Sequence, residues 1–169
     1  QQVPVSAPEA LRIAAYIDAR PAEKRQGLRA RLIAADAKTR AQPKAEVARQ
    51  MLPCPFLDHG ACQIYPVRPL ACRAFVSLDV APCKSVFAGA PQPIPTPRVF
   101  MLLEDFCASA LRWAAAKLAL KPEFYELHGA VRVALETPDA ERRWLAGEDP
   151  FAAAKGHPTM GNAPAAPAK

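Results

Sequence analysis

Proline-rich sequence in the middle of the chain is the feature that most restricts its fold. Nine of the 19 prolines in these 169 residues fall between Pro53 and Pro97. Each fixes its own φ angle, removes a backbone donor and biases the preceding residue away from the helical region. We therefore expect residues 52–97 to form an irregular, loop-rich region. The same segment holds four of the five cysteines, Cys54, Cys62, Cys72 and Cys83.

Helical patterns flank the proline-rich segment. Ser6 and Glu9 form a capping-box pattern, which predicts a helix from about residue 7 to residue 19. Pro21 suits the first turn of a second helix, which should end near residue 41. Later helices are expected over 98–120, 122–135 and 138–146, with short helical turns over 44–50 and after 149. The only strand candidate is 62–65, after a turn at 58–60.

The chain is short enough for one domain, which we place at residues 1–154. The stretch 155–169 contains small, polar and proline residues without periodicity, so we expect it to be a disordered tail. The predicted fold class is mainly α, with helices packed around an irregular, proline-rich metal-binding loop region.

Positive charge is concentrated in one predicted helix. The formal net charge is +6, and the stretch from Arg20 to Arg40 contains seven basic residues and two acidic ones. A basic helix can contact phosphates, yet the stretch lacks interleaved aromatic residues, a glycine-rich loop and a recognisable nucleic-acid-binding motif. We therefore favour a solvated helix face without a nucleic acid partner. A nucleic-acid- or protein-binding module that uses this helix is the alternative.

The cysteine count favours reduced thiols over a disulfide framework. Five is an odd number, and the chain is longer than the small secreted domains that depend on disulfides. We therefore expect a cytoplasmic protein whose thiolates bind metal. The sequence contains no run of 18 apolar residues, so no membrane-spanning segment is expected.

The spacing of the cysteines does not identify the metal. Cys54, Cys62 and Cys72 are separated by seven and nine residues, and ten residues separate Cys72 from Cys83. These gaps differ from the cysteine pairs of zinc ribbons and from the tight clusters of bacterial ferredoxins. Fixed φ angles lower the entropy cost of bringing several thiolates to one point. Because thiolates suit zinc and iron–sulfur clusters alike, we expect one centre of zinc or iron, with an iron–sulfur cluster as an option.

The run from Cys54 to Phe75, which reads CPFL…GxCxIY…RPxxCRxF, resembles the core signature of the YkgJ-type cysteine-cluster family of zinc- or iron-chelating domains. The resemblance implies that Cys54, Cys62 and Cys72 are metal ligands. It also implies that one or more cysteines of a CxxxCxxCC-like cluster lie just before Gln1. A flagellin lysine methylase is similar to this family in its cysteine pattern and is thought to carry an iron–sulfur cluster, which favours iron.

Two arginines match the RP and CR elements of that signature. Arg68 and Arg73 would assist cofactor binding, because cationic donors beside thiolates offset the negative charge of a multi-thiolate centre. The alternative is that both arginines pair with surface carboxylates.

Four further residues in or near the signature also have predicted roles. Cys83 lies outside the best-matched part and is predicted to be a fourth metal ligand. His59 lies in a turn and is expected to face water rather than metal. Tyr65 and Phe75 are expected to pack over the centre and limit solvent.

Cys107 belongs to a different pattern. It lies with Leu103, Leu111 and Leu118 on one stripe of the predicted helix over 98–120. At such spacing a cysteine behaves as a small apolar residue, so we expect Cys107 to pack in the core.

The sequence therefore predicts a metal-binding protein and identifies no reaction. An iron–sulfur-dependent redox or group-transfer enzyme is the alternative from the enzyme class. A methylase reaction is disfavoured, because no glycine-rich nucleotide loop or strand–helix alternation for a methyl-donor cofactor is visible.

Overall fold

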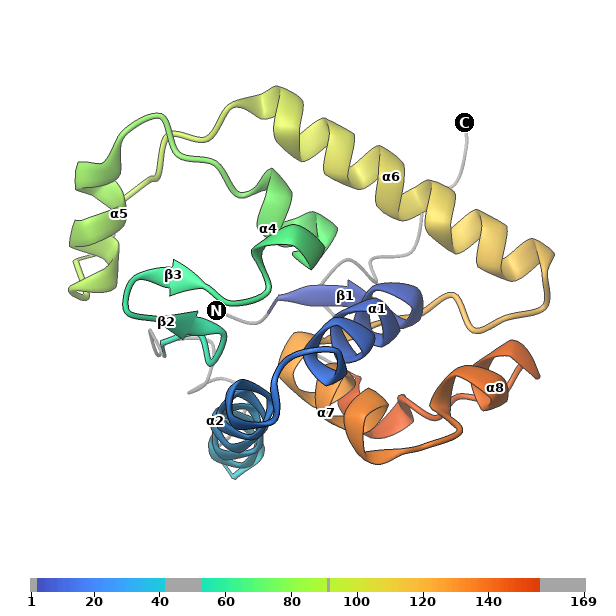
Figure 1. The fold of residues 1–169 in the computed structure, drawn as a ribbon. Helices are drawn as coiled ribbons and strands as arrows, with labels where there is room; N and C mark the ends of the chain where they lie inside the picture. The colour runs from blue at the N-terminus through green and yellow to red at the C-terminus, as the bar shows by residue number, and fades with distance from the viewer. Residues whose placement is uncertain (1–2, 42–52, 91, 156–169) are drawn as a thin grey trace, which may run out of the picture.

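The computed structural model describes residues 3–41, 53–90 and 92–155, and these form a mainly helical protein (Figure 1). This confirms the prediction of a mainly α fold. The elements in chain order are β1 (Pro4–Ser6), α1 (Ala7–Asp18), α2 (Ala22–Arg40), β2 (Leu57–Asp58), β3 (Ala61–Cys62), η1 (Tyr65–Val67), α4 (Leu70–Ala74), α5 (Val80–Phe87), α6 (Arg98–Lys117), β4 (Phe124–Glu126), α7 (Leu127–Glu136), α8 (Ala140–Leu145) and η2 (Ala152–Ala154).

The core lies where α1 and α2 pack against α7. Helix α1 buries Ala10, Ile13 and Ile17, which recur at the three- and four-residue spacing of one helix face. Helix α2 adds Leu28 and Leu32 from its own buried face. Among the described residues, no helix is both long enough and apolar enough to cross a membrane.

Strands β1 and β4 fix the starts of α1 and α7 next to each other. They pair antiparallel, with Val5 opposite Tyr125, and each strand runs directly into its helix. The backbone N–H of Leu127 donates to the carbonyl of Val3 at 3.0 Å, which extends the contact into the first residue of α7. This pairing joins segments about 120 residues apart in sequence.

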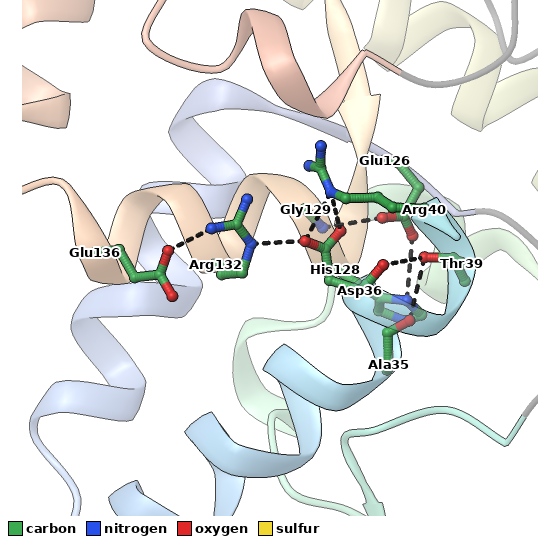
Figure 2. Close-up of polar contacts among 9 residues, drawn as sticks. All are labelled: Ala35, Asp36, Thr39, Arg40, Glu126, His128, Gly129, Arg132 and Glu136. Carbon is green, nitrogen blue, oxygen red and sulfur yellow. Dashed lines mark hydrogen bonds and ion pairs between the residues drawn. The ribbon is translucent and has the colours of Figure 1, made fainter. Parts of the chain in front are cut away.

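A buried carboxylate joins α2 to α7 (Figure 2). Asp36 is 3% exposed, and its Oδ2 accepts hydrogen bonds from Nε of Arg40 at 2.8 Å and Nε of Arg132 at 2.6 Å. Arg132 also forms an ion pair with Glu136 one turn further along α7. A buried charge is tolerable only when it is paired and hydrogen-bonded, and here two guanidinium groups meet that condition.

Several basic residues of α2 make contacts within the protein. Arg29 forms an ion pair with Asp18 at 2.8 Å. Arg31 donates to the carbonyl of Pro55 at 3.1 Å and lies 3.6 Å from the carboxylate of Asp58. Part of the positive charge noted in the sequence therefore attaches α2 to α1 and to the hairpin formed by β2 and β3.

Most predicted helices are present, with corrected ends. The helices expected over 7–19, 21–41, 98–120 and 138–146 correspond to α1, α2, α6 and α8, and the turn expected after 149 is η2. The prediction for 122–135 was wrong at its start, because residues 124–126 form β4 and α7 begins only at Leu127. The predicted turn over 44–50 and the tail from 156 onward lie outside the described residues.

The close approach of α2 to α7 predicts opposite effects for two glycine substitutions. A Cβ atom at Gly129 would lie 2.9 Å from Nη2 of Arg40, 3.1 Å from Cβ of Ala154 and 3.2 Å from Oδ1 of Asp36. Overpacking of this kind costs about 1–3 kcal/mol, more than the roughly 1 kcal/mol that alanine gains over glycine in a helix. We expect Gly129→Ala to lower the free energy of unfolding by about 1 kcal/mol in urea denaturation.

Gly27 is the matched control. It lies in α2, is exposed, and a Cβ there would have no atom within 4 Å apart from its chain neighbours and the surrounding helix backbone. Gly27→Ala should therefore raise the free energy of unfolding by about 0.5–1 kcal/mol. Stabilisation by both substitutions would contradict the close packing described at Gly129.

Candidate metal site

The first two signature cysteines lie on a short hairpin. Strands β2 and β3 pair antiparallel with Leu57 opposite Cys62. The turn between them has φ values of 47° at His59 and 77° at Gly60, the left-handed pair that a tight two-residue hairpin loop requires. The turn predicted at 58–60 is confirmed, and the strand is shorter and begins earlier than the predicted 62–65.

Two apolar side chains anchor this hairpin in the core. Phe56 and Ile64 are 1% and 2% exposed, and the Phe56 ring centroid lies 6.3 Å from that of His128 in α7. These two residues alternate with the cysteines along the chain. Burial of Phe56 and Ile64 therefore fixes where Cys54 and Cys62 lie.

The third signature cysteine, Cys72, lies in α4, and a glutamate from α1 positions this helix. The Glu9 carboxylate accepts from the backbone N–H of Ser6 at 2.9 Å and from its hydroxyl at 2.6 Å. Its other oxygen accepts from the backbone N–H of Leu70 at 2.7 Å. The capping box predicted from sequence is present, and the same side chain also binds the first residue of α4.

The structure brings Cys54, Cys62 and Cys72 close enough to influence one another. Burial, and after it the neighbouring Cys54 and Cys62 thiolates, raise the pKa of Cys72 to about 12, although Arg68 acts in the opposite direction. Burial also raises the pKa of Cys54, although the residue as a whole is exposed. Backbone N–H groups of Phe56 and Leu57 act in the opposite direction on Cys54. Hydrogen bonds from backbone amides are a common way to stabilise metal-bound thiolates.

These three residues form a group of thiols rather than a finished coordination shell. In the described parts of the chain, no set of three or more His, Cys, Asp or Glu side chains has the arrangement of a metal site. All five cysteines are free, so no disulfide competes for the sulfur atoms. The donor chemistry fits zinc or iron, and binding would draw the sulfurs closer together.

The two signature arginines brace the loop that precedes Cys72. Arg73 donates to the carbonyls of Arg68 at 2.8 Å and Pro66 at 2.9 Å. Arg68 lies 3.6 Å from the ring centroid of Tyr65 and donates to its carbonyl. Among the described residues, neither guanidinium forms an ion pair with a carboxylate. The alternative that both arginines pair with surface carboxylates is therefore wrong for this part of the chain.

Cys83 and Cys107 lie apart from this group. The sulfur of Cys83 points to the carbonyl of Asp79 at 3.7 Å, within α5. Cys107 is half-buried beside a groove of about 530 Å³ that Arg12 and Leu70 also line.

The predicted core stripe around Cys107 was wrong. Leu103, Leu111 and Leu118 are all exposed, and no residue of α6 is buried. An apolar stripe shows that a helix has an apolar face, and it does not show which surface covers that face.

The side chains of His59, Tyr65 and Phe75, near the signature cysteines, are all largely exposed. His59 is 97% exposed and lies 3.0 Å from Asp58, so it faces water as predicted. Tyr65 and Phe75 are both more than half exposed. The prediction that they pack over the centre was wrong for Tyr65, which stacks with Arg68. Phe75 lines the cavity that reaches Cys72.

This cavity has a volume of about 500 Å³ and is lined by Val3, Arg68, Cys72, Phe75 and Glu104, among others. Burial raises the pKa of Glu104, and the nearby carboxylates add to the effect. The segment at Val3 therefore lies beside the third cysteine. Sequence reasoning missed this cavity and the contact from Glu9 to Leu70, because both join residues that are far apart in the chain.

Comparison with known proteins gives one family match. The model of the CxxCxxCC family, described as "Putative zinc- or iron-chelating domain", matches residues 18–108, which is more than half of the chain. The matched range includes all five cysteines, although the spacing that gives the family its name does not occur among them. No curated protein and no solved structure matches the chain significantly.

The double role of Glu9 predicts a large effect on stability. Glu9→Ala removes a helix cap worth about 1 kcal/mol and leaves the Leu70 N–H without its acceptor, which costs a further 1–3 kcal/mol or so. We expect a loss of about 2 kcal/mol in the free energy of unfolding. Amide hydrogen exchange at Leu70 should become faster as well.

Glu23 provides the control, because it lies in the first turn of α2, is exposed, and makes no hydrogen bond among the described residues. Glu23→Ala should change stability by less than about 0.5 kcal/mol. Equal effects of the two substitutions, or unchanged exchange at Leu70 in Glu9→Ala, would contradict the role given to Glu9.

Proposed function

Because the chain belongs to the CxxCxxCC family of zinc- or iron-chelating domains, we propose that it binds one zinc or iron ion through Cys54, Cys62 and Cys72. The observation that carries this proposal is the family match over residues 18–108, and the proximity of Cys54 and Cys62 to Cys72 supports it. The hairpin and α4 are separate elements, so the proposed site would join two parts of the described chain.

The residues around the sulfurs suit a thiolate centre. Arg68 supplies a positive charge that lowers the pKa of Cys72. Amides of Phe56 and Leu57 supply hydrogen bonds to Cys54. Metal binding requires the thiols to release their protons, and these groups favour the deprotonated sulfur.

A bound metal would supply a cross-link between the hairpin and α4, and iron would add redox chemistry. The protein's own residues hold the sulfurs in place: Phe56 and Ile64 fix the hairpin, and Glu9 fixes the start of α4. Arg73 keeps the loop before Cys72 in shape through its two backbone carbonyl acceptors.

The fourth ligand stays a prediction. Structural zinc sites use four ligands, and the sequence prediction of Cys83 for this position is part of the proposal. Its sulfur contacts the Asp79 carbonyl, so ligation by Cys83 would require α5 to move toward the other three cysteines.

A second candidate is an iron–sulfur-dependent redox or group-transfer enzyme. The cavity of about 500 Å³ beside Cys72 favours it, because such a volume can hold a small substrate next to the centre. The visible absorption spectrum of anaerobically purified protein, together with elemental analysis, distinguishes the candidates. Absorption of an iron–sulfur type supports the enzyme, and colourless protein with stoichiometric zinc supports a structural site.

Single substitutions of the three signature cysteines test the ligand set. Cys54→Ser, Cys62→Ser and Cys72→Ser should each weaken metal binding by more than about 100-fold, since even changes to the surroundings of a ligand cost 10–100-fold. Each should also lower the thermal unfolding temperature of the metal-loaded protein, because binding energy is folding energy in such sites. Metal content by elemental analysis and the unfolding temperature are the two measurements.

Cys107→Ser is the matched control, because Cys107 is also half-buried but lies apart from the thiol group. It should keep the full metal content. Full metal occupancy in all three signature variants would refute the proposed site. Loss of metal in Cys83→Ser would establish the fourth ligand.

A further inference from the structure

A groove of about 530 Å³ lies where residues of α1, α4 and α6 meet (Figure 1). It is distinct from the cavity that reaches Cys72, although Arg68 lines both. Its volume is within the range of about 300–1,000 Å³ that is usual for small-molecule sites. The groove is therefore large enough to hold a small ligand.

Three arginines line this groove. Arg12 comes from α1, Arg73 comes from α4, and Arg68 lies between η1 and α4. Among the described residues that line the groove, Glu9 is the only acidic one. Both oxygens of its carboxylate already accept hydrogen bonds from neutral donors. The lining therefore carries three positive charges against one negative charge.

Neutral partners already hold two of these arginines in place. Arg73 donates from Nε to the carbonyl of Arg68 and from Nη2 to the carbonyl of Pro66. The guanidinium of Arg68 lies 3.6 Å from the ring centroid of Tyr65. None of these partners is a carboxylate, so the positive charges are not neutralised by an ion pair. Because both guanidiniums are fixed beforehand, they would lose little conformational entropy on binding an anion.

Arg12 has no structural contact of this kind. It is exposed, and it makes no hydrogen bond or ion pair with any described residue. Glu9 lies three residues before it on α1, yet the Glu9 carboxylate binds Ser6 and Leu70 instead. The guanidinium of Arg12 can therefore bind a ligand without giving up a contact that the described fold needs.

The rest of the lining is mostly apolar and includes Val67, Leu70 and Leu111. Charges of one sign in a cleft with apolar walls concentrate the electric field and attract ions of the opposite sign. Guanidinium groups bind carboxylates and phosphates through paired N–H donors. Apolar walls with a few fixed charged groups are typical of sites for small organic ligands. The groove therefore suits a ligand that has an oxyanion at one end and an apolar body.

We propose that this groove binds a small organic anion whose carboxylate or phosphate group contacts Arg12, Arg68 and Arg73. The apolar body of the ligand lies along Val67 and Leu70. The groove does not include Cys54, Cys62 or Cys72, so this binding does not depend on a bound metal.

Isothermal titration calorimetry of the full chain with octanoate and with octyl phosphate tests the site. Saturable binding of either probe supports the proposal, and the tighter of the two identifies the oxyanion. Arg12→Glu should raise the Kd of the tighter probe about 10-fold or more, because it removes a charged hydrogen-bond donor and adds a negative charge. Arg12 is exposed, so the circular dichroism spectrum and the unfolding temperature should not change.

Arg98→Glu is the matched control, because Arg98 is exposed, does not line the groove, and its replacement changes the net charge by the same amount. This variant should bind the probe as the unaltered protein does. Absence of saturable binding of both probes would overturn the proposal, and so would equal Kd values in the two variants. Equally tight binding of octylammonium, or of acetate and inorganic phosphate, would also overturn it. Neither variant alters a cysteine, so failure here leaves the test of the metal site intact.

Discussion

The cysteine segment depends on anchors outside itself. Strands β2 and β3 contain two residues each, and an isolated hairpin is marginal in water even when it is longer. Helix α4 is a single turn. Burial of Phe56 and Ile64 and the hydrogen bond from Leu70 to Glu9 attach these short elements to the helical core. Packing of the core therefore determines where the thiols lie. A change that loosens α1 or α7 should also displace the cysteines.

The sequence was most informative where structure is local. The Ser6–Glu9 pattern gave the start of α1, because a capping box involves only residues three apart. The concentration of prolines predicted an irregular, loop-rich region, and its described part contains the hairpin, η1, α4 and α5. The prolines led us to miss helices α4 and α5. Pro69 and Pro82 lie at the start of these helices, where proline is tolerated, rather than in the interior.

Local sequence patterns did not predict the contacts between residues that are far apart in the chain. Strands β1 and β4 have three residues each, too few for alternation to show, and they pair across about 120 residues of sequence. The position of α6 illustrates the same limit. Its amphipathic pattern correctly predicted a helix, whereas the surface that covers the apolar face depends on the arrangement of the whole chain.

Charge balance connects the thiol group to its surroundings. Three thiolates without a cation would place three negative charges close to Glu9, and burial together with the neighbouring thiolates raises the pKa of Cys72 to about 12. Against three thiolates, a divalent cation would supply two positive charges and Arg68 a third, whereas a fourth thiolate from Cys83 would leave one negative charge. This balance explains why an arginine at position 68 suits a site with three thiolates, and why lysine, whose ammonium cannot stack on Tyr65 in the same planar manner, would be a poorer replacement.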